Sequence, residues 1–352
     1  MGSRGEGPPA RAKIIPVMMA ATLDRFILEE EHAHPGATGE LSLLLMRFGV
    51  AGKRIARELA MAGLKKTHGL AGSENVQGEE QQKLDLIAND ILLETFDYGG
   101  LVTIAASEEL DEPVLYQDSG GQGRYAVLFD PMDGSSNIDV NGVLGTIFSI
   151  RRRGKGTAAD LLRPGHEQIA AGYILFGPAV LFAYTCGEGV NLFTLDPSIG
   201  EFLLTQRQLR MPARGRGFAV NEGRCAGWSP EVRAFVEYLK EKDPESGRPY
   251  STRYSGSMVA DVHRFLLEGG IYLYPSDSLS AGKSRGKLRI LYECHPMAMV
   301  VEQAGGKAST GQERALDVTP ESLHDRMPFA IGSQAEVSLY ESFLRGERAQ
   351  DG

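Results

Sequence analysis

Apolar residues recur along the chain with two different periods, and the period indicates where helices and strands lie. Between residues 41 and 64 apolar side chains return every three to four positions, which predicts a long amphipathic helix capped by Thr38-Gly39-Glu40. The same spacing predicts a second helix over residues 84–96. Residues 68–82 are rich in Gly, Asn and Glu and have no period, so we expect a mobile loop there.

Short apolar and β-branched runs predict the strands. Two of these runs, at 101–105 and 125–129, are apolar on both faces and indicate buried strands. Five more runs lie at 146–150, 170–176, 180–185, 190–195 and 201–204. Because the turns between the later runs are short, we expect these strands to pair antiparallel. A mixed α/β fold is therefore predicted, and a doubly wound dinucleotide fold is disfavoured.

The second half of the chain is predicted to form a separate unit. A length of 352 residues at roughly 150 per domain suggests two domains, and an arginine-rich linker lies near 201–217. In the second unit, the pattern predicts helices near 230–240, 257–268 and 296–304 and a strand at 270–274. The expected organisation is a tail at 1–13, an N-terminal domain at 14–205, a C-terminal domain at 206–344 and a tail at 345–352.

Charge and composition exclude several classes of function. The chain has 46 Asp and Glu against 37 Lys and Arg, a net charge of −9, which disfavours a nucleic-acid or membrane-surface binder. No window approaches 18 uninterrupted apolar residues, and the polar N-terminus lacks the apolar core of a secretory signal. Three widely spaced cysteines form no CxxC motif. We expect a cytoplasmic protein.

Two of the predicted buried strands end directly in paired acids. The strand at 101–105 leads to Glu108 and Glu109, and the strand at 125–129 leads to Asp130 and Asp133. The acids Glu79, Asp85 and Glu293 lie beside predicted helices. Each pair alone is more often a solvated turn, but two pairs at the ends of apolar strands indicate a site.

A convergent set of carboxylates has a definite chemistry. Two like charges ~4 Å apart repel by roughly 4 kcal/mol at an effective dielectric of about 20, so the cluster must hold protons or bind cations. Oxygen ligands without His or Cys favour Mg²⁺, with Mn²⁺ as the alternative. Gly134-Ser135-Ser136 follows the second pair and offers N–H and hydroxyl groups to phosphate oxygens. The residues therefore predict metal-dependent phosphate chemistry.

Several longer motifs resemble one enzyme family. Phe129-Asp-Pro-Met-Asp-Gly-Ser-Ser-Asn137 resembles the D-P-[LIM]-D-G-[ST] motif of lithium-sensitive sugar and inositol phosphatases. Segments similar to class I fructose-1,6-bisphosphatases lie at 75–79, 83–85, 221–223, 256–264, 269–275 and 286–298. The resemblance runs from about Thr22 to Leu344. It implies a layered α-β-α-β-α fold with largely antiparallel and mixed sheets in two domains. It also implies Mg²⁺-dependent hydrolysis of the 1-phosphate of fructose 1,6-bisphosphate.

The resemblance also implies roles for single residues. Metal ligands would be Glu108, Glu109, Asp130, Asp133, Glu293 and the backbone carbonyl of Met132. The attacking water would be activated by Asp85 and Glu109, with help from Glu79. The 1-phosphate would be held by Asp133, Gly134, Ser135 and Ser136. The 6-phosphate would be held by Asn221, Tyr254, Tyr274 and Lys287, with Arg253 reaching in from a neighbouring subunit of a homotetramer. By residue type alone, the tyrosines would be core or interface aromatics.

An inhibitory AMP site is the remaining implication of the resemblance. It would be formed by Thr38, Gly39, Glu40, Ser42, Arg124, Tyr125 and Arg152. The alternative is a simple helix cap beside a solvated basic turn. Two residues depart from the family pattern. Arg224 replaces a common Tyr and would rewire a 6-phosphate contact, and His295 replaces a common Asn and would be a supporting donor or a pH-sensitive modulator.

Three other functions stay open at this point. A bifunctional fructose-1,6-/sedoheptulose-1,7-bisphosphatase of carbon fixation would need only modest extra room near Tyr254 and Arg224. An inositol monophosphatase would share the acidic motif but would have no use for Lys287, Tyr274 and Arg253. A catalytically silent nucleotide-binding regulator is disfavoured because all seven acids are present.

Overall fold

The computed structural model describes residues 20–33, 37–65, 67, 69–74, 80–97, 99–116, 123–154, 157–279 and 286–347. Its helices are α1 Leu23–Ala33, α2 Glu40–Lys65, α3 Lys83–Asp97, α4 Pro230–Lys240, α5 Met258–Glu268, α6 His295–Gln303 and α7 Gln334–Leu344. The larger sheet contains β3 Val102–Ser107, β4 Val114–Leu115, β5 Tyr125–Asp133, β6 Leu144–Arg152, β7 Gln168–Phe176, β8 Val180–Thr185, β9 Val190–Asp196 and β10 Glu201–Leu209. The second sheet contains β11 Gly217–Ala219, β12 Ser251–Thr252, β13 Ile271–Tyr274, β15 Lys307–Ser309 and β17 Phe329–Gly332. Two short pairs are β1 Leu70–Glu74 with β2 Glu80–Gln82, and β14 Leu288–Arg289 with β16 Arg326–Met327.

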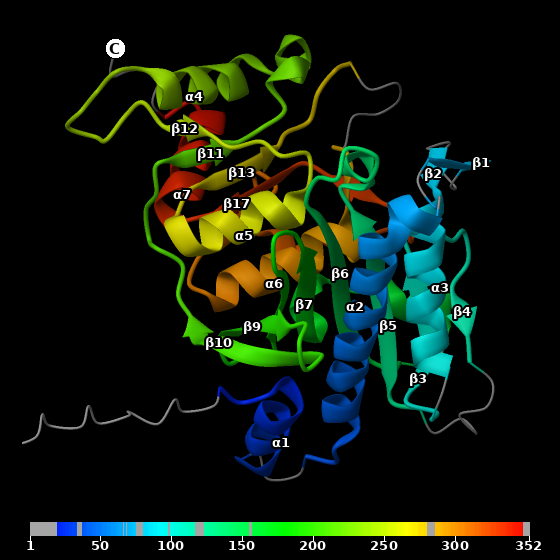
Figure 1. Ribbon diagram of the computed structural model, residues 1–352. Coiled ribbons are helices and arrows are strands. Elements are labelled where there is room, and N and C mark those ends of the chain that lie inside the picture. The colour runs from blue at the N-terminus through cyan, green and yellow to red at the C-terminus, as the bar shows by residue number, and fades with distance from the viewer. Residues whose placement is uncertain are drawn as a thin grey trace, which may run out of the picture.

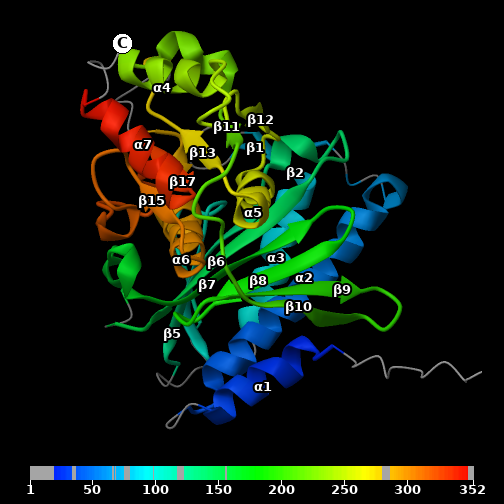
Figure 2. The same ribbon diagram turned by 90° about the vertical axis from the view of Figure 1, so that its left-hand side faces the viewer.

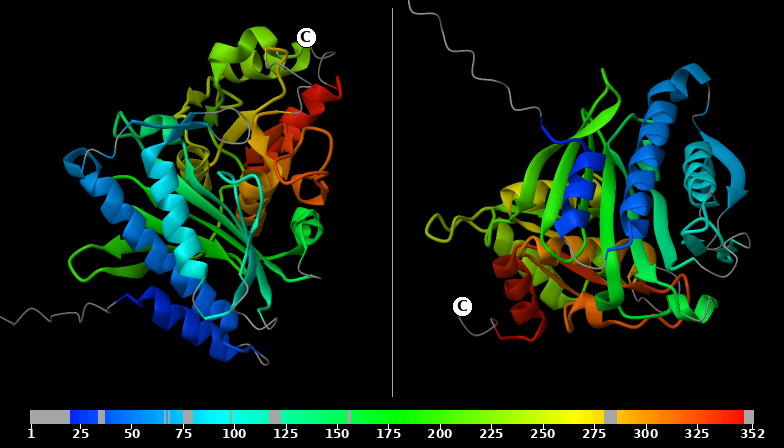
Figure 3. Two further views of the ribbon diagram at one scale, coloured as in Figure 1. Left: turned by 90° about the vertical axis from the view of Figure 1, so that its right-hand side faces the viewer. Right: turned by 90° about the horizontal axis from the view of Figure 1, so that it is seen from below.

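The elements stack in five layers, as Figures 1 and 2 show. The helices α1, α2 and α3 cover one face of the eight-stranded sheet, and Figure 3 shows them side by side in blue to cyan. The helices α5 and α6 fill the space between this sheet and the five-stranded sheet, and α4 and α7 cover the outer face of the latter. This arrangement confirms the predicted α-β-α-β-α fold.

The strand order of the larger sheet explains both its run of consecutive antiparallel strands and the edge at which the acids lie. The larger sheet has the order β10-β9-β8-β7-β6-β5-β3-β4. Each successive pair from β5 to β10 is antiparallel, and for the pairs from β7 to β10 the short turns predicted this. The pair β3–β5 is parallel, because the chain crosses over between them. The carboxyl ends of β3 and β5 therefore meet at one edge of the sheet.

The apolar stripe of α2 packs tightly on the larger sheet. Phe48 stacks on Phe148 of β6 with ring centroids 4.0 Å apart, and both rings are fully buried. Close approach depends on Gly52, since a Cβ at this position would lie 2.7 Å from Cδ1 of Ile174.

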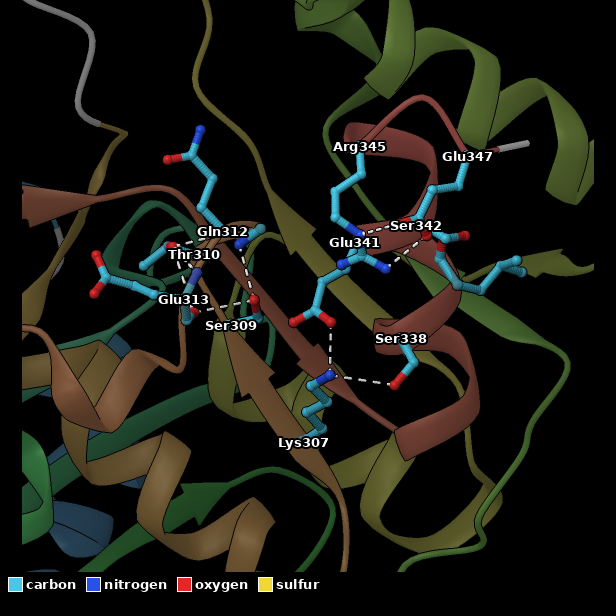
Figure 4. Close-up of polar contacts among 12 residues, drawn as sticks. Lys307, Ser309, Thr310, Gln312, Glu313, Ser338, Glu341, Ser342, Arg345 and Glu347 are labelled. Carbon is cyan, nitrogen blue, oxygen red and sulfur yellow. Dashed lines mark hydrogen bonds and ion pairs between the residues drawn. The ribbon is translucent and has the colours of Figure 1, made fainter. Parts of the chain in front are cut away.

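On the other side of the molecule, Lys307 of β15 connects α7 to the smaller sheet. Its ammonium group donates hydrogen bonds to Glu341 at 2.6 Å and to Ser338 at 3.2 Å (Figure 4).

The structure differs from the sequence predictions at weakly apolar segments. The predicted loop at 68–82 contains the antiparallel pair β1–β2, which the backbone forms without an apolar pattern. The strand predicted at 201–204 continues as β10 to residue 209, because the edge of the sheet tolerates exposed polar side chains. The helix α1 was not predicted, and its Phe26 packs edge-on against Phe193 at 5.4 Å. Within the described residues, no helix is both long enough and apolar enough to cross a membrane.

Candidate active site

Parallel pairing brings two of the predicted acids together. Ser107 at the end of β3 lies opposite Phe129 of β5, and the N–H of Glu108 donates to the carbonyl of Phe129 at 3.1 Å. Glu108 therefore lies beside Asp130. The pairing of β5 with β6 shifts register between Asp130 and Asp133, so that both of these acids face the same edge of the sheet.

The third acid comes from the other half of the chain. Glu293 lies in a π-helical turn, Ile290–Cys294, directly before α6. Such wide turns project a side chain in a direction that a regular helix does not, and they occur often at functional sites. Carboxylate oxygens of Glu108, Asp130 and Glu293 all lie within 4.8 Å of one another. The sequence prediction that these acids converge is confirmed by this geometry.

These acids line a cavity with a volume of about 160 Å³. Its acidic residues are Asp85, Glu108, Glu109, Asp130, Asp133 and Glu293. Its other polar residues are Ser135, Ser136, Tyr254, Tyr272, Tyr274, Lys287 and Arg289, and Met132, Gly134, Gly256, Met258 and Leu288 complete the wall. The cavity thus combines carboxylates with hydroxyl groups and two cations. Of the predicted site residues, Glu79 lies outside the described part of the chain.

Burial and mutual repulsion raise the pKa values of these acids. Burial raises the pKa of Asp130 well above its ordinary range, and the charges of Glu108 and Glu293 add to the effect. Burial, followed by the charge of Glu108, raises the pKa of Glu293 to about 8. Burial, followed by the charge of Glu109, raises the pKa of Asp85 to about 8. Without a bound cation, the cluster holds protons near neutral pH.

The donor set suits a hard divalent cation. Oε2 of Glu108 and Oδ1 of Asp85 are buried without a hydrogen-bond partner among the described residues, so oxygen ligands are available. The cluster also contains a cation of its own, since buried Arg289 forms an ion pair with Glu108. The backbone N–H of Arg289 donates to Oε2 of Glu293 at 2.6 Å. Sequence reasoning did not single out Arg289, although it lies within the 286–298 motif.

The helix α5 holds Asp133 from the opposite side. Oδ2 of Asp133 accepts hydrogen bonds from Oγ of Ser257 at 2.6 Å and from the N–H of Val259 at 2.8 Å, and Oδ1 accepts from the N–H of Met258 at 3.2 Å. Burial raises the pKa of Asp133 to about 6, and these hydrogen bonds oppose that rise. The next residue, Gly134, has a left-handed backbone with φ 79°, and a Cβ there would lie 2.6 Å from Cβ of Ser257. The turn at Ser135 needs this glycine.

The remaining predicted substrate residues fall into two groups. Tyr254, Tyr274 and Lys287 line the cavity itself. Asn221 lines a small adjoining cavity that also contains Tyr274. Burial raises the pKa of the Tyr254 hydroxyl to about 12, and the nearby Asn221 amide opposes that rise. Arg253 is exposed and lines a separate hollow next to Tyr254, so within one chain it does not reach the acids.

Comparisons with known proteins identify the family. The model of the fructose-1-6-bisphosphatase N-terminal domain matches residues 21–207, and that of the C-terminal domain matches residues 211–345. Relatives named fructose-1,6-bisphosphatase class 1 from Chloroherpeton thalassium and Chlorobium luteolum are each 47% identical over 332 residues, covering 93% of this chain and 94% and 98% of theirs. The chain belongs to the fructose-1,6-bisphosphatase family.

Solved structures agree with this assignment. Fructose-1,6-bisphosphatase of Leishmania major in its holo form has 38% identity and a TM-score of 0.86, covering 93% of this chain and 99% of the other. Its apo form has 36% identity and a TM-score of 0.81 over the same shares. The resemblance predicted from the sequence motifs is therefore confirmed for the family and for the fold.

The residues assigned by resemblance to an AMP site also gather in one place. Arg124 forms an ion pair with Glu40 at 3.2 Å, and Arg152 lies opposite Tyr125 across β5 and β6. Burial, followed by the charge of Glu40, raises the pKa of Tyr125. Gly39 has a left-handed backbone, and its carbonyl accepts the N–H of Leu43, so α2 begins here. Thr38 and Ser42 flank this helix start.

His295 is a buried structural residue in this environment. It is fully buried, and its Nδ1 lies 3.2 Å from Nη2 of Arg151, which is also fully buried. Burial, followed by the charge of Arg151, lowers the pKa of His295 to about 3. The ring therefore stays neutral at physiological pH, which favours the supporting role over the pH-sensitive one.

Proposed function

We propose that the protein hydrolyses the 1-phosphate of fructose 1,6-bisphosphate, giving fructose 6-phosphate and phosphate. The observation that carries this proposal is the convergence of Glu108, Asp130 and Glu293 within 4.8 Å in a cavity that also contains serine, tyrosine and lysine donors. The relatives named fructose-1,6-bisphosphatase support the choice of substrate.

The proposed metal ligands are Glu108, Glu109, Asp130, Asp133, Glu293 and the backbone carbonyl of Met132. Mg²⁺, or Mn²⁺, bound to these oxygens would polarise the phosphoryl group and offset its negative charge. The unpartnered buried oxygen of Glu108 supports this assignment. The hydrogen bonds from Ser257 and Val259 fix the orientation of Asp133 whether or not a cation is bound.

The proton of the attacking water is accepted by Asp85 together with Glu109. Asp85 suits this role because it lies in the cavity wall, it has a buried unpartnered oxygen, and its raised pKa is close to the working pH of a general base. Glu79 remains a predicted assistant. The leaving phosphate is held by Gly134, Ser135 and Ser136, whose N–H and hydroxyl groups suit its oxygens.

The second phosphate of the sugar is bound by Asn221, Tyr254, Tyr274 and Lys287. Lysine neutralises a phosphate, and tyrosine hydroxyl groups give oriented hydrogen bonds. Arg253 joins them from a neighbouring subunit, which requires a homo-oligomer, by resemblance a tetramer. The exposed position of Arg253 supports a role outside its own chain. The cysteines are unpaired thiols, which fits a cytoplasmic location.

The test is phosphate release from fructose 1,6-bisphosphate with Mg²⁺ or with EDTA. Asp130→Asn and Glu293→Gln should each lower kcat by about 10³-fold or more, because a metal-binding charge is lost. Asp317→Asn, a similar change at an exposed surface acid, should leave kcat unchanged. Near-normal turnover in both cavity variants would contradict the proposal. Sedoheptulose 1,7-bisphosphate and inositol 1-phosphate, assayed in parallel, test the two alternative phosphatase substrates.

AMP inhibition is proposed as the regulation of this activity. Two arginines, Arg124 and Arg152, lie close to the start of α2, where free N–H groups and the helix dipole favour an anion. The site comprises Thr38, Gly39, Glu40, Ser42, Arg124, Tyr125 and Arg152. Titration calorimetry with AMP should detect binding that Arg152→Ala weakens by about tenfold. AMP binding without any phosphate release would favour the silent regulator instead.

A further inference from the structure

A partly buried ion pair lies directly behind Tyr274 of the cavity. Nε of Arg224 donates to Oδ2 of Asp277 at 2.6 Å, and Nη2 donates to Oδ1 at 2.8 Å. We call this two-bonded pair the Arg224–Asp277 fork. The Asp277 side chain is 5% exposed and that of Arg224 is 33% exposed. Two parallel charge-assisted hydrogen bonds fix the relative orientation of two planar groups, which a single contact does not do.

The fork joins two segments that each carry a residue of the sugar-phosphate wall. Arg224 lies three residues after Asn221, and Asp277 lies three residues after Tyr274. The segments touch at a second point, where the N–H of Ser278 donates to the carbonyl of Gly227 at 2.9 Å. The spacing between the segments is therefore set by contacts at two points of the turn Glu222–Gly227, in its middle at Arg224 and at its end at Gly227.

Gly227 shows how close this packing is. A Cβ at this position would lie 2.8 Å from Cγ of Leu279 and 3.1 Å from Cβ of Asp277. The N–H of Leu279 also donates to Oδ1 of Asp277 at 2.9 Å, so the carboxylate is held by its own segment as well as by Arg224. A side chain this constrained transmits a displacement of one segment to the other.

The residues positioned by the fork are in contact with the cavity. Tyr274 lines both the main cavity and the small cavity that contains Asn221, Arg224 and Asp277. Asn221 lies close enough to Tyr254, which also lines the main cavity, for its amide to oppose the burial-induced rise in the pKa of the Tyr254 hydroxyl. The fork thus lies directly behind Tyr274, which faces the main cavity, and behind Asn221, which lines the adjoining small cavity.

The chemistry of a bisphosphate explains why this layer matters. One phosphate is taken to the acidic cluster, where a cation offsets the charge. The second phosphate is also an anion, and the uncompensated carboxylates of the cluster would repel it. It must lie against the cationic and hydroxyl-bearing part of the wall, which contains Tyr254, Tyr274 and Lys287.

We propose that the Arg224–Asp277 fork positions Asn221 and Tyr274 to receive the second phosphate, and so makes the enzyme selective for bisphosphates over sugars with one phosphate. This inference rests on the proposed function. Arg224 and Asp277 are positioning residues: their effect reaches the ligand through Asn221 and Tyr274.

The experiment compares two substrates that differ only in the second phosphate, fructose 1,6-bisphosphate and fructose 1-phosphate. Steady-state kinetics are measured for the wild type, Arg224→Ala, Arg224→Lys and Asp277→Asn in saturating Mg²⁺. The matched control is Arg314→Ala, because Arg314 donates from Nε to Oε1 and from Nη2 to Oε2 of Glu302, the same kind of two-bonded pair in the same half of the chain and outside the cavity wall. Thermal unfolding shows that each variant is folded.

For Arg224→Ala and Asp277→Asn, we expect KM for the bisphosphate to rise about tenfold while kcat stays within about twofold. A tenfold change in KM corresponds to the loss of about one charge-assisted hydrogen bond to the substrate. The kcat/KM for fructose 1-phosphate should stay within about twofold. Arg224→Lys should fall between wild type and Arg224→Ala, because an ammonium group does not form the fork. Arg314→Ala should match the wild type on both substrates.

Two results would overturn the inference while leaving the proposed function intact. Equal losses on both substrates would mean that the fork supports the fold alone, and unchanged KM in all fork variants would mean that it does not act on the phosphate. The mild changes Arg224→Lys and Asp277→Asn keep the test decisive if Arg224→Ala does not fold. A wild-type chain that releases no phosphate from the bisphosphate would overturn the proposed function and the inference together.

Discussion

The raised pKa values of the cavity acids predict that the cation-free protein loses stability as the pH rises from 7 to 8. Asp85 and Glu293 are buried, and both have a pKa of about 8 in the folded chain. In the unfolded chain, these groups titrate near 3.9 and 4.3. The folded protein therefore holds protons that the unfolded chain has already released. Their stabilising effect is complete below pH 4 and is lost as the pH rises through about 8.

The size of the effect follows from proton linkage. A group with a pKa of about 8 goes from about nine-tenths to about half protonated between pH 7 and 8, which lowers the free energy of unfolding by about 1 kcal/mol. Two such groups give about 2 kcal/mol over this interval, and Asp130, whose pKa burial also raises well above its ordinary range, adds to the loss in the same direction. Half-buried His263 and buried His295 have lowered pKa values, so they are neutral in the folded chain. These histidines change the pH dependence of the free energy of unfolding little above pH 7, because a histidine in the unfolded chain titrates near 6.5 and is then mostly neutral too.

The assay is urea-induced unfolding at pH 7 and pH 8 in EDTA at constant ionic strength. Wild type should lose at least about 2 kcal/mol between the two conditions, and Glu293→Gln should lose at least about 1 kcal/mol less than wild type, because one titrating group is gone and its charge no longer raises the pKa of Asp130. Glu313→Gln, a change at an exposed glutamate, should behave as wild type. Saturating Mg²⁺ should stabilise the protein more at pH 8 than at pH 7, because the ligands bind it only when deprotonated.

Two outcomes would refute this reasoning. Equal stability at pH 7 and 8 in EDTA would show that the acids are solvated and titrate as ordinary carboxyl groups. An unchanged pH dependence in Glu293→Gln would show that the protons are held elsewhere. Either result would also remove the electrostatic reason for cation binding at this cavity, since repulsion among the acids is what the cation offsets.

Three further predictions concern single contacts. Gly134→Ala should lower kcat at least about tenfold in phosphate-release assays, because the added Cβ would lie 2.6 Å from Cβ of Ser257 at the start of α5. The control is Gly187→Ala, which has a similar left-handed backbone in open space. It should lower the free energy of unfolding by about 1 kcal/mol and leave kcat unchanged. Asn137→Ala removes an Nδ2 donor 3.2 Å from the carbonyl of Ser255, and KM in steady-state kinetics should rise severalfold with kcat within about twofold. Arg151→Met removes a fully buried donor from the carbonyls of Arg163 and Pro164, and urea denaturation should show a loss of about 3 kcal/mol.

Local sequence patterns predicted the elements whose apolar residues meet the core on one regular face. The apolar period at 41–64 became α2, and the one at 84–96 became α3, with at most one residue of difference at each end. The short turns after β7 and β8 predicted antiparallel pairing, because no crossover fits in them. Elements at the periphery were missed. Helix α1 buries only Leu23, Phe26 and Ile27, too few residues to give a clear period.

The site could be predicted only as far as neighbouring sequence determines it. The acids after β3 and β5 were found because each follows an apolar strand directly. The groups that hold those acids come from far along the chain. Ser257 is 124 residues from Asp133, and Arg289 is 181 residues from Glu108. No local pattern specifies such a pair, because each member looks like an ordinary polar residue until folding brings the two together.

The distribution of charge between the two halves explains why the site lies at their junction. Asp85, Glu108, Asp130 and Asp133 belong to residues 21–207, and their mutual repulsion opposes the fold of that half. The compensating groups belong to residues 211–345: Arg289 pairs with Glu108, and the first N–H groups of α5 bind Asp133. Docking of the second half therefore offsets part of the repulsion among the acids, but it also adds the carboxylate of Glu293, and a bound cation offsets the remainder. Cation affinity and the contact between the halves are consequently coupled, since each stabilises the same arrangement of carboxylates.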